Sequence, residues 1–292
     1  MKKQIRFIAV HMYNDFSGSP RVLADFCSIS SIQSQSLTVV TNLTPGFLDT
    51  RLGSVKYIWY PKSKSVALKF LLFTLAQIQI FFMVITLALR GRIAGEQVVV
   101  INNTIFALTS LLASRLVGAL TISYVHESFS GHKWVHMIIK NYIRFMAHEV
   151  ILVSKFLFHH YGFDLDRARL LPNGLRLDFV GDHEIDYEEK FERGKVLFVG
   201  SLRPYKGIFE LIKIARKTPF MEFNAVFNCT ENELEAFLRE KHVPRNLRAV
   251  ARDSNLMDRY KTAFVVMNLS LKPDCLEGFA LTVLEGMSFG CP

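Results

Sequence analysis

Two carboxylates separated by seven residues occur near the end of the sequence, in the run Glu277-Gly-Phe-Ala-Leu-Thr-Val-Leu-Glu285. A buried-type strand pattern, residues 264–270, precedes Glu277, and the apolar spacing after Gly278 predicts a helix. A glycine lets a ligand approach the backbone, and the first N–H groups of a helix attract anions. Because Glu285 follows Glu277 by a little over two helical turns, both carboxylates lie on roughly the same side. The pattern favours a ligand that combines phosphate with hydroxyl groups.

A second candidate anion site lies in the loop between a predicted strand, 195–200, and the next predicted helix. This loop carries Gly200, Ser201, Arg203 and Lys206. Two cations and the amides of a helix N-terminus suit a diphosphate. The alternative is an ordinary strand-to-helix loop with solvated charges.

Two positions in the first half of the chain follow predicted strands. Gly18 lies in the turn after the first strand, where a phosphate or an acceptor could approach. This turn lacks the G-x-G-x-x-G spacing, so it does not support a nicotinamide cofactor. His126, within 124–128, lies at the carboxyl end of a predicted parallel strand. In open α/β sheets, active residues lie at these ends. A lone histidine is also often structural.

The pattern of elements predicts two α/β domains. Continuous β-branched strands alternate with helices, which predicts parallel sheets covered on both faces. We expect a doubly wound, Rossmann-like domain over 1–177, an acidic linker over 178–194 and a second such domain over 195–292, with the ligand bound between them. Strands are expected at 5–11, 37–41, 55–60, 98–102, 120–126, 149–154, 168–173, 195–200, 221–227, 247–251 and 264–270.

Composition narrows the function classes. The 292 residues are 50% hydrophobic and carry a net charge of +9, which suits phosphorylated ligands, anionic membranes or nucleic acid. No basic run is interleaved with aromatic residues, so we expect no nucleic-acid partner. Asp164 and Asp166 lie in a polar loop, and we expect no metal. The cysteines lack metal or redox spacing, which fits a reducing cytoplasm; they are Cys27, Cys229, Cys275 and Cys291.

The most apolar stretch is 66–89, in which Lys69 is the only charged residue. Its length would allow it to span a bilayer. Polar residues within it, and predicted strands on both sides, favour a helix packed on the sheet instead. The remaining alternatives are a helix that also dips into an anionic membrane surface and a true span.

Together these motifs resemble the retaining GT-B-fold glycosyltransferases of family four, over nearly the whole chain. The residues that carry the resemblance are the Gly18 turn, His126, 172–174, the loop 199–207, Glu277 with Glu285, and 290–292. Our preferred hypothesis is a cytoplasmic enzyme that builds polysaccharide or glycolipid of the cell envelope; the apolar stretch 66–89 and the positive charge suggest contact with the inner face of an anionic membrane and a lipid-linked acceptor. The enzyme would transfer a sugar from a nucleotide diphosphate sugar to a glycan or lipid-linked acceptor without a cofactor or metal.

The resemblance also implies roles for individual residues. Glu277 would bind the donor sugar near the reaction centre, and His126 would reach the same sugar from the first domain. Lys206, with Arg203, would neutralise the diphosphate, and Glu285 would bind the ribose. The remaining donor-binding positions would be backbone contacts, at Gly18, Gly200, Ser201, Gly278, Phe279, Ala280 and Leu281.

The chain departs from the family pattern at two places. Ser201 stands where family members often carry arginine, and the family's second domain usually continues beyond the equivalent of 290–292. We therefore expect a truncated second domain that binds the donor poorly. Two alternatives to a glycosyltransferase remain: a GT-B-fold sugar-nucleotide epimerase, and an inactive fragment that binds a nucleotide sugar.

Overall fold

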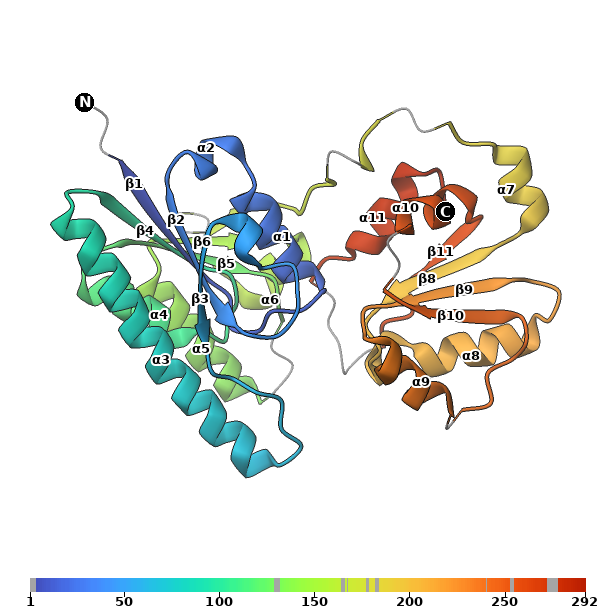
Figure 1. Ribbon diagram of the computed structural model, residues 1–292, viewed down its shortest axis with the longest axis horizontal. Coiled ribbons are helices and arrows are strands. Elements are labelled where there is room, and N and C mark those ends of the chain that lie inside the picture. Colours follow the sequence, from blue (N-terminus) through green and yellow to red (C-terminus); the bar gives the residue numbers. More distant parts are fainter. Residues whose placement is uncertain are drawn as a thin grey trace. The chain divides into compact units, whose positions relative to one another are not determined.

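The computed structural model describes residues 4–128, 132–163, 166, 168–176, 179–181, 184–239, 241–252, 255–271 and 278–292. The chain forms two compact units, 1–172 and 173–292, each with its own sheet (Figure 1). The expected linker, 178–194, lies in the second unit and contains helix α7 (Tyr187–Arg193).

The first unit is built on a seven-stranded sheet in the order β3-β2-β1-β4-β5-β6-β7. All of its strand pairs are parallel. The strands are β1 (Ile5–Val10), β2 (Ser36–Asn42), β3 (Ser54–Ile58), β4 (Gln97–Asn102), β5 (Leu120–Val125), β6 (Glu149–Leu152) and β7 (Ala168–Leu170). The helices are α1 (Gly18–Cys27), α2 (Ser30–Gln33), the 3-10 turn η1 (Thr50–Leu52), α3 (Val66–Ile93), α4 (Leu108–Leu116), α5 (Lys133–Met146) and α6 (Lys155–Tyr161).

Alternate residues of the central strands face two separate cores, as the pleat of a strand requires. Ile8 and Val10 of β1 pack in the cluster that α3 covers. Ala9, between them, packs with Leu23 and Cys27 of α1 on the other face. The sheet is therefore covered on both faces, which explains why its central strands read as continuous apolar runs.

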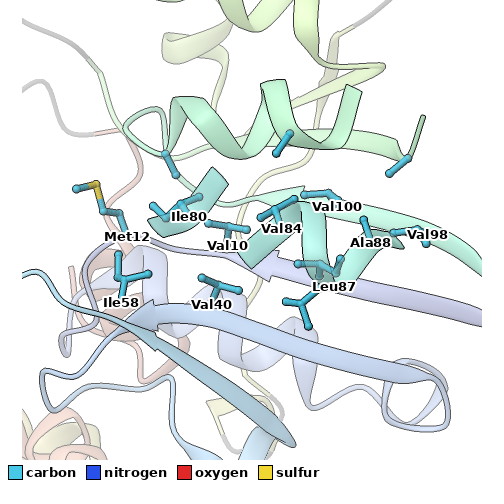
Figure 2. Packing of buried hydrophobic residues seen from close by; sticks show 14 of the residues in the cluster. Val10, Met12, Val40, Ile58, Ile80, Val84, Leu87, Ala88, Val98 and Val100 are labelled. Atoms are coloured by element: carbon cyan, nitrogen blue, oxygen red, sulfur yellow. The ribbon is translucent and has the colours of Figure 1, made fainter. Parts of the chain in front are cut away.

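Helix α3 packs on the sheet through one of its two apolar faces. Ala76, Ile80, Val84 and Ala88 recur at helical spacing and lie against strands β1 and β4 (Figure 2). Strands β3 and β4, which flank α3 in the sequence, belong to one sheet, and a membrane-spanning α3 would separate them. Among the described residues, α3 is the helix long and apolar enough to cross a bilayer.

The opposite face of α3 is also apolar and lies at the surface. Leu71, Leu75, Ile78, Phe82 and Leu89 follow one another at helical spacing and are all exposed. We call these five residues the outer stripe of α3.

The second unit repeats the beginning of the same topology. Its sheet has the order β10-β9-β8-β11 with all pairs parallel, which corresponds to β3-β2-β1-β4 of the first unit. The strands are β8 (Val196–Gly200), β9 (Phe223–Phe227), β10 (Leu247–Ala251) and β11 (Val265–Met267). The helices are α7, the 3-10 turn η3 (Pro204–Lys206), α8 (Ile208–Lys217), α9 (Glu231–Arg239), α10 (Leu256–Thr262) and α11 (Leu281–Ser288). Cores on both faces of this sheet confirm two doubly wound domains.

A buried lysine joins α7 to the last residues of the chain. Lys190 is 4% exposed, and its ammonium donates hydrogen bonds to the carbonyl oxygens of Tyr260 and Phe289. It also donates to Sγ of Cys291. An ammonium group has three donors and is costly to bury unpaired, so these three acceptors account for its position.

Replacing Ile80 by alanine tests the packing of α3. Ile80 is fully buried, so Ile80→Ala should lower the free energy of unfolding by about 2–5 kcal/mol. Ile78→Ala on the same helix is the control; Ile78 is exposed, and its loss should cost no more than about 0.5 kcal/mol. Chemical unfolding of the whole chain measures both values, and equal losses would contradict the assignment of faces.

Candidate active site

In each unit the strand order reverses between two neighbouring strands, β1 and β4 in the first and β8 and β11 in the second. At such a point the following helices leave toward opposite faces of the sheet, and ligands of open α/β sheets bind outside the carboxyl ends of these strands. The candidate residues of each unit are therefore expected at this edge.

In the first unit, three polar residues directly follow three adjacent strands. His11 follows β1, Asn103 lies one residue past the end of β4, and His126 follows β5. His126 Nε2 lies 2.9 Å from Asn103 Oδ1, and His11 Nδ1 lies 3.0 Å from the Asn103 carbonyl oxygen. With Glu127, whose carboxylate accepts a hydrogen bond from the Ile105 amide at 3.3 Å, we call these residues the strand-end cluster.

Burial sets the charge state of the strand-end cluster. It lowers the pKa of His126 to about 3, with a smaller contribution from His11, and it also lowers the pKa of His11. Both imidazoles are therefore neutral at pH 7. Burial raises the pKa of Glu127 to about 7, although hydrogen bonds from Thr104 and from nearby amides act in the opposite direction.

The same cluster is connected to the turn that carries Gly18. Asn103 Nδ2 donates a hydrogen bond of 3.0 Å to the carbonyl oxygen of Ser19, in the first turn of α1. Gly18 is exposed and is the first residue of α1; the approach of a ligand to it stays a prediction. The Asn103 side chain thus connects His126 with Ser19, the residue after Gly18.

In the second unit, the loop after β8 carries the predicted cations. Arg203 is exposed, and its guanidinium lies 3.4 Å from the Tyr205 hydroxyl; Lys206 is half-buried, with its ammonium 5.9 Å from the Tyr205 ring centre. Gly200 ends β8, and Ser201 follows it, half-buried. The loop is held against the segment after β11 because the Leu271 amide donates to the Tyr205 carbonyl oxygen at 2.8 Å.

Gly207 is the one position of this loop where the structure requires glycine. Its φ is +84°, and a Cβ atom there would lie 2.2 Å from the Leu269 carbonyl oxygen. A Cβ at Gly200 would meet its nearest neighbour, the Phe198 ring, at an ordinary 3.4 Å. Close packing of Gly207 on Leu269 therefore brings the cationic loop beside the chain that leads toward α11.

The predicted positions Gly278, Phe279 and Ala280 lie just before α11, and Leu281 is its first residue. Glu277 lies outside the described residues. Gly278, Phe279, Ala280 and Leu281 are half-buried. The first amides of a helix have no partner within it, so this segment can offer donors to an anion.

Glu285 is on α11 and is almost completely buried, at 1% exposed. The Tyr260 hydroxyl on α10 donates a hydrogen bond of 2.7 Å to its carboxylate. This contact fixes the carboxylate within the second unit, and the binding of a ribose there stays a prediction.

Sequence reasoning missed His11 and Asn103. Each is a polar residue directly after an apolar parallel strand, and that placement is a signal that could have pointed to them. The sequence predicts no metal at Asp164 and Asp166. Asp164 lies outside the described residues, so this stays a prediction.

Comparison with known proteins gives one family-model match, over part of the chain, and several structures of the same fold. Residues 182–292 match the family model described as "Glycosyl transferases group 1", and this range lies within the second unit. No curated protein matches the sequence.

Several solved structures share the fold. A glycosyltransferase from Rickettsia africae superposes with a TM-score of 0.69 at 14% identity, covering 100% of this chain and 78% of that one. The lipopolysaccharide outer core galactosyltransferase WaaB, in its apo form, gives 0.62 at 18%, covering 99% and 79%. A protein assigned as a UDP-N-acetylglucosamine 2-epimerase, from Listeria monocytogenes, gives 0.56 at 11%, covering 91% and 74%.

These comparisons confirm the predicted GT-B architecture, with parallel sheets of seven and four strands. The group 1 glycosyl transferase model matches the second unit, and solved glycosyltransferases share the fold of the chain. Since an epimerase-type protein has the same fold, the fold alone does not decide the reaction.

Replacing Gly207 by alanine tests the geometry of the cationic loop. Gly207→Ala should lower the free energy of unfolding by more than about 1 kcal/mol, because the backbone is left-handed there and the new Cβ meets Leu269. Gly200→Ala is the matched control, with no such clash. Thermal or chemical unfolding checks the prediction, and a Gly207→Ala protein as stable as its control would contradict it.

Proposed function

We propose that this protein is a retaining glycosyltransferase of family four that moves a sugar from a nucleotide diphosphate sugar to a polysaccharide or lipid-linked acceptor. The observation that carries the proposal is the position of the cationic loop and of the start of α11. They follow β8 and β11, the two strands between which the order of the second sheet reverses.

The donor is assigned mainly to the second unit. Lys206 and Arg203 neutralise the diphosphate, assisted by backbone amides near Gly200 and Ser201. The segment from Gly278 to Leu281 faces the phosphate and the sugar with its amides, and Glu285 binds the ribose. Glu277 and His126 bind the sugar, and the turn at Gly18 approaches the donor phosphate or the acceptor.

The proposed step breaks the bond between the sugar's anomeric carbon and the diphosphate oxygen. The acceptor oxygen forms the new bond on the same face, and its proton passes to the leaving diphosphate. Charge therefore develops on the diphosphate, where fixed cations and helix N–H groups stabilise it most. Glu277 stabilises positive charge on the sugar ring in this scheme, which invokes neither a cofactor nor a metal.

The outer stripe of α3 supports a cytoplasmic protein that acts at the inner face of a membrane. Exposed apolar patches of this kind are unusual on soluble surfaces. Exposed cations flank the stripe along the chain, at Lys64, Lys69 and Arg90, and suit anionic headgroups. A lipid-linked or envelope polysaccharide acceptor would then be presented at the same surface.

Donor binding is tested by thermal shift with UDP, GDP, ADP and their common sugar conjugates. One nucleotide should stabilise the protein selectively, by a shift that grows with ligand concentration. Lys206→Ala should reduce that shift because the diphosphate loses a cation. Lys213→Ala removes an exposed charge from α8 and is the control that should leave the shift unchanged.

Product analysis distinguishes the proposed reaction from its alternatives. The proposal expects free nucleoside diphosphate to appear only with an acceptor, and NMR of the product to show the donor's anomeric configuration. Conversion of the sugar nucleotide without acceptor would identify an epimerase. Binding of a sugar nucleotide without turnover, whichever acceptor is added, would favour the inactive fragment.

Membrane contact is tested by flotation with vesicles that contain anionic lipid. We expect binding that weakens as salt rises, and a severalfold loss in the double variant Ile78→Ser, Phe82→Ser. Phe220→Ser is the control, since Phe220 is 84% exposed but lies in the second unit. Equal flotation of all three proteins would contradict a role for the outer stripe.

A further inference from the structure

The orientation of the Asn103 side chain is fixed by its neighbours. Its Nδ2 lies 3.0 Å from the Ser19 carbonyl oxygen, which can only accept a hydrogen bond. A rotated amide would place two acceptors against each other, so Nδ2 must face Ser19. The same nitrogen lies 3.1 Å from His11 Nδ1, but this contact is not a hydrogen bond, because Nδ1 carries the proton that it donates to the Asn103 carbonyl oxygen. Asn103 Oδ1 is therefore the atom that faces His126.

This orientation determines which tautomer His126 adopts. Asn103 Oδ1 is an acceptor 2.9 Å from His126 Nε2, so Nε2 must carry the proton. In a neutral imidazole the other nitrogen, Nδ1, is then an acceptor. The ring is also held from one side by Tyr124, whose ring centre lies 4.3 Å away.

The Glu127 side chain stabilises the backbone segment that carries His126. Its carboxylate accepts a hydrogen bond from the Ile105 amide at 3.3 Å, and Thr104 and the amides of His126 and Glu127 also favour its charged form. One carboxylate thus connects the segment after β4 with the segment after β5. The Tyr161 hydroxyl of α6 donates to the Glu127 carbonyl oxygen at 3.1 Å and braces the same segment.

We propose that Asn103 and Glu127 are positioning residues for His126. Asn103 holds the imidazole in its neutral Nε2–H tautomer, and the ionised Glu127 holds the main chain beneath it, so that Nδ1 is presented as an acceptor to a substrate hydroxyl. The assignment of that hydroxyl to a donor sugar rests on the proposed function; the tautomer and the bracing do not.

The strand-end cluster predicts that the acidic limb of the pH–activity profile belongs to Glu127 and not to a histidine. A histidine in an active site would ordinarily produce an acidic limb near its own pKa of about 6.5. Burial keeps the pKa of His126 near 3, lowers that of His11 and raises that of Tyr124 to about 12. Glu127, with a pKa of about 7, is the group among these that changes charge near neutrality.

Protonation of Glu127 replaces one acceptor with a donor and disrupts the bracing, so activity should fall as pH decreases through about 7. Glu127→Gln should remove this limb and leave a lower, flat profile. Asn103→Ala should reduce kcat on the order of tenfold to a hundredfold, as for other groups that orient an active histidine, with a smaller change in donor KM. A limb near 7 that survives Glu127→Gln would overturn the role of Glu127.

The tautomer is measured without any turnover, by ¹⁵N NMR of imidazole nitrogens in protein labelled at its nine histidines. His126→Gln identifies the His126 signals. We expect a neutral Nε2–H ring from pH 6 to 8, and mixed tautomers in Asn103→Ala. Asn141→Ala, an exposed asparagine on α5, is the control that should leave the signals unchanged.

An Nδ1–H or charged His126 in the unmodified protein would overturn the role of Asn103, even if Asn103→Ala does not fold. If the tautomer is as expected but no sugar nucleotide is turned over, the positioning stands and the proposed function fails. If a sugar nucleotide is turned over but His126 has the other tautomer, the proposed function stands and the positioning role fails.

Discussion

Parallel pairing of the strands is the constraint on which both units depend. It collects the carboxyl ends of all strands of a sheet at one edge, and it requires a crossover helix between paired neighbours. In both units the first strand has neighbours on two sides, β2 and β4 in one and β9 and β11 in the other. The helices after β1 and β4 therefore leave toward opposite faces, and the space between them is where chemistry-bearing side chains can face solvent without breaking the sheet's hydrogen bonds.

The polar groups at this edge of the first unit form one connected set because each would be expensive to bury alone. Asn103 is fully buried; its side chain joins α1 and the end of β5 through Ser19 and His126, and its carbonyl oxygen accepts a hydrogen bond from His11 at the end of β1. The Glu127 carboxylate connects the main chain after β4 with the main chain after β5. A functional histidine and a helix N-terminus are thus fixed by residues that need not touch a ligand.

Much of this architecture could be predicted from local patterns. Continuous apolar strands, and the residues directly after them, were sufficient to predict the sheets, the Gly18 turn and the position of His126. Asn103 was missed, because its placement directly after a strand is a signal that an ordinary turn gives equally well. The two faces of α3 could not be separated either, since both are apolar and only the sheet distinguishes Ile80 from Ile78. The acidic stretch around α7 reads as a linker because the acceptors that bury Lys190 lie 70 to 101 residues further along the chain.

That last separation has a consequence for the order of folding. Closing so long a loop costs chain entropy before any packing energy is gained, which slows folding. During synthesis, α7 emerges early in its unit, whereas the groups that accept hydrogen bonds from the Lys190 ammonium are made 70 to 101 residues later. Until Phe289 and Cys291 have left the ribosome, Lys190 lacks two of its three acceptors. The nascent second unit therefore exposes the apolar face that α7, Tyr260 and Phe289 later cover, and it is in this interval that chaperones would find it.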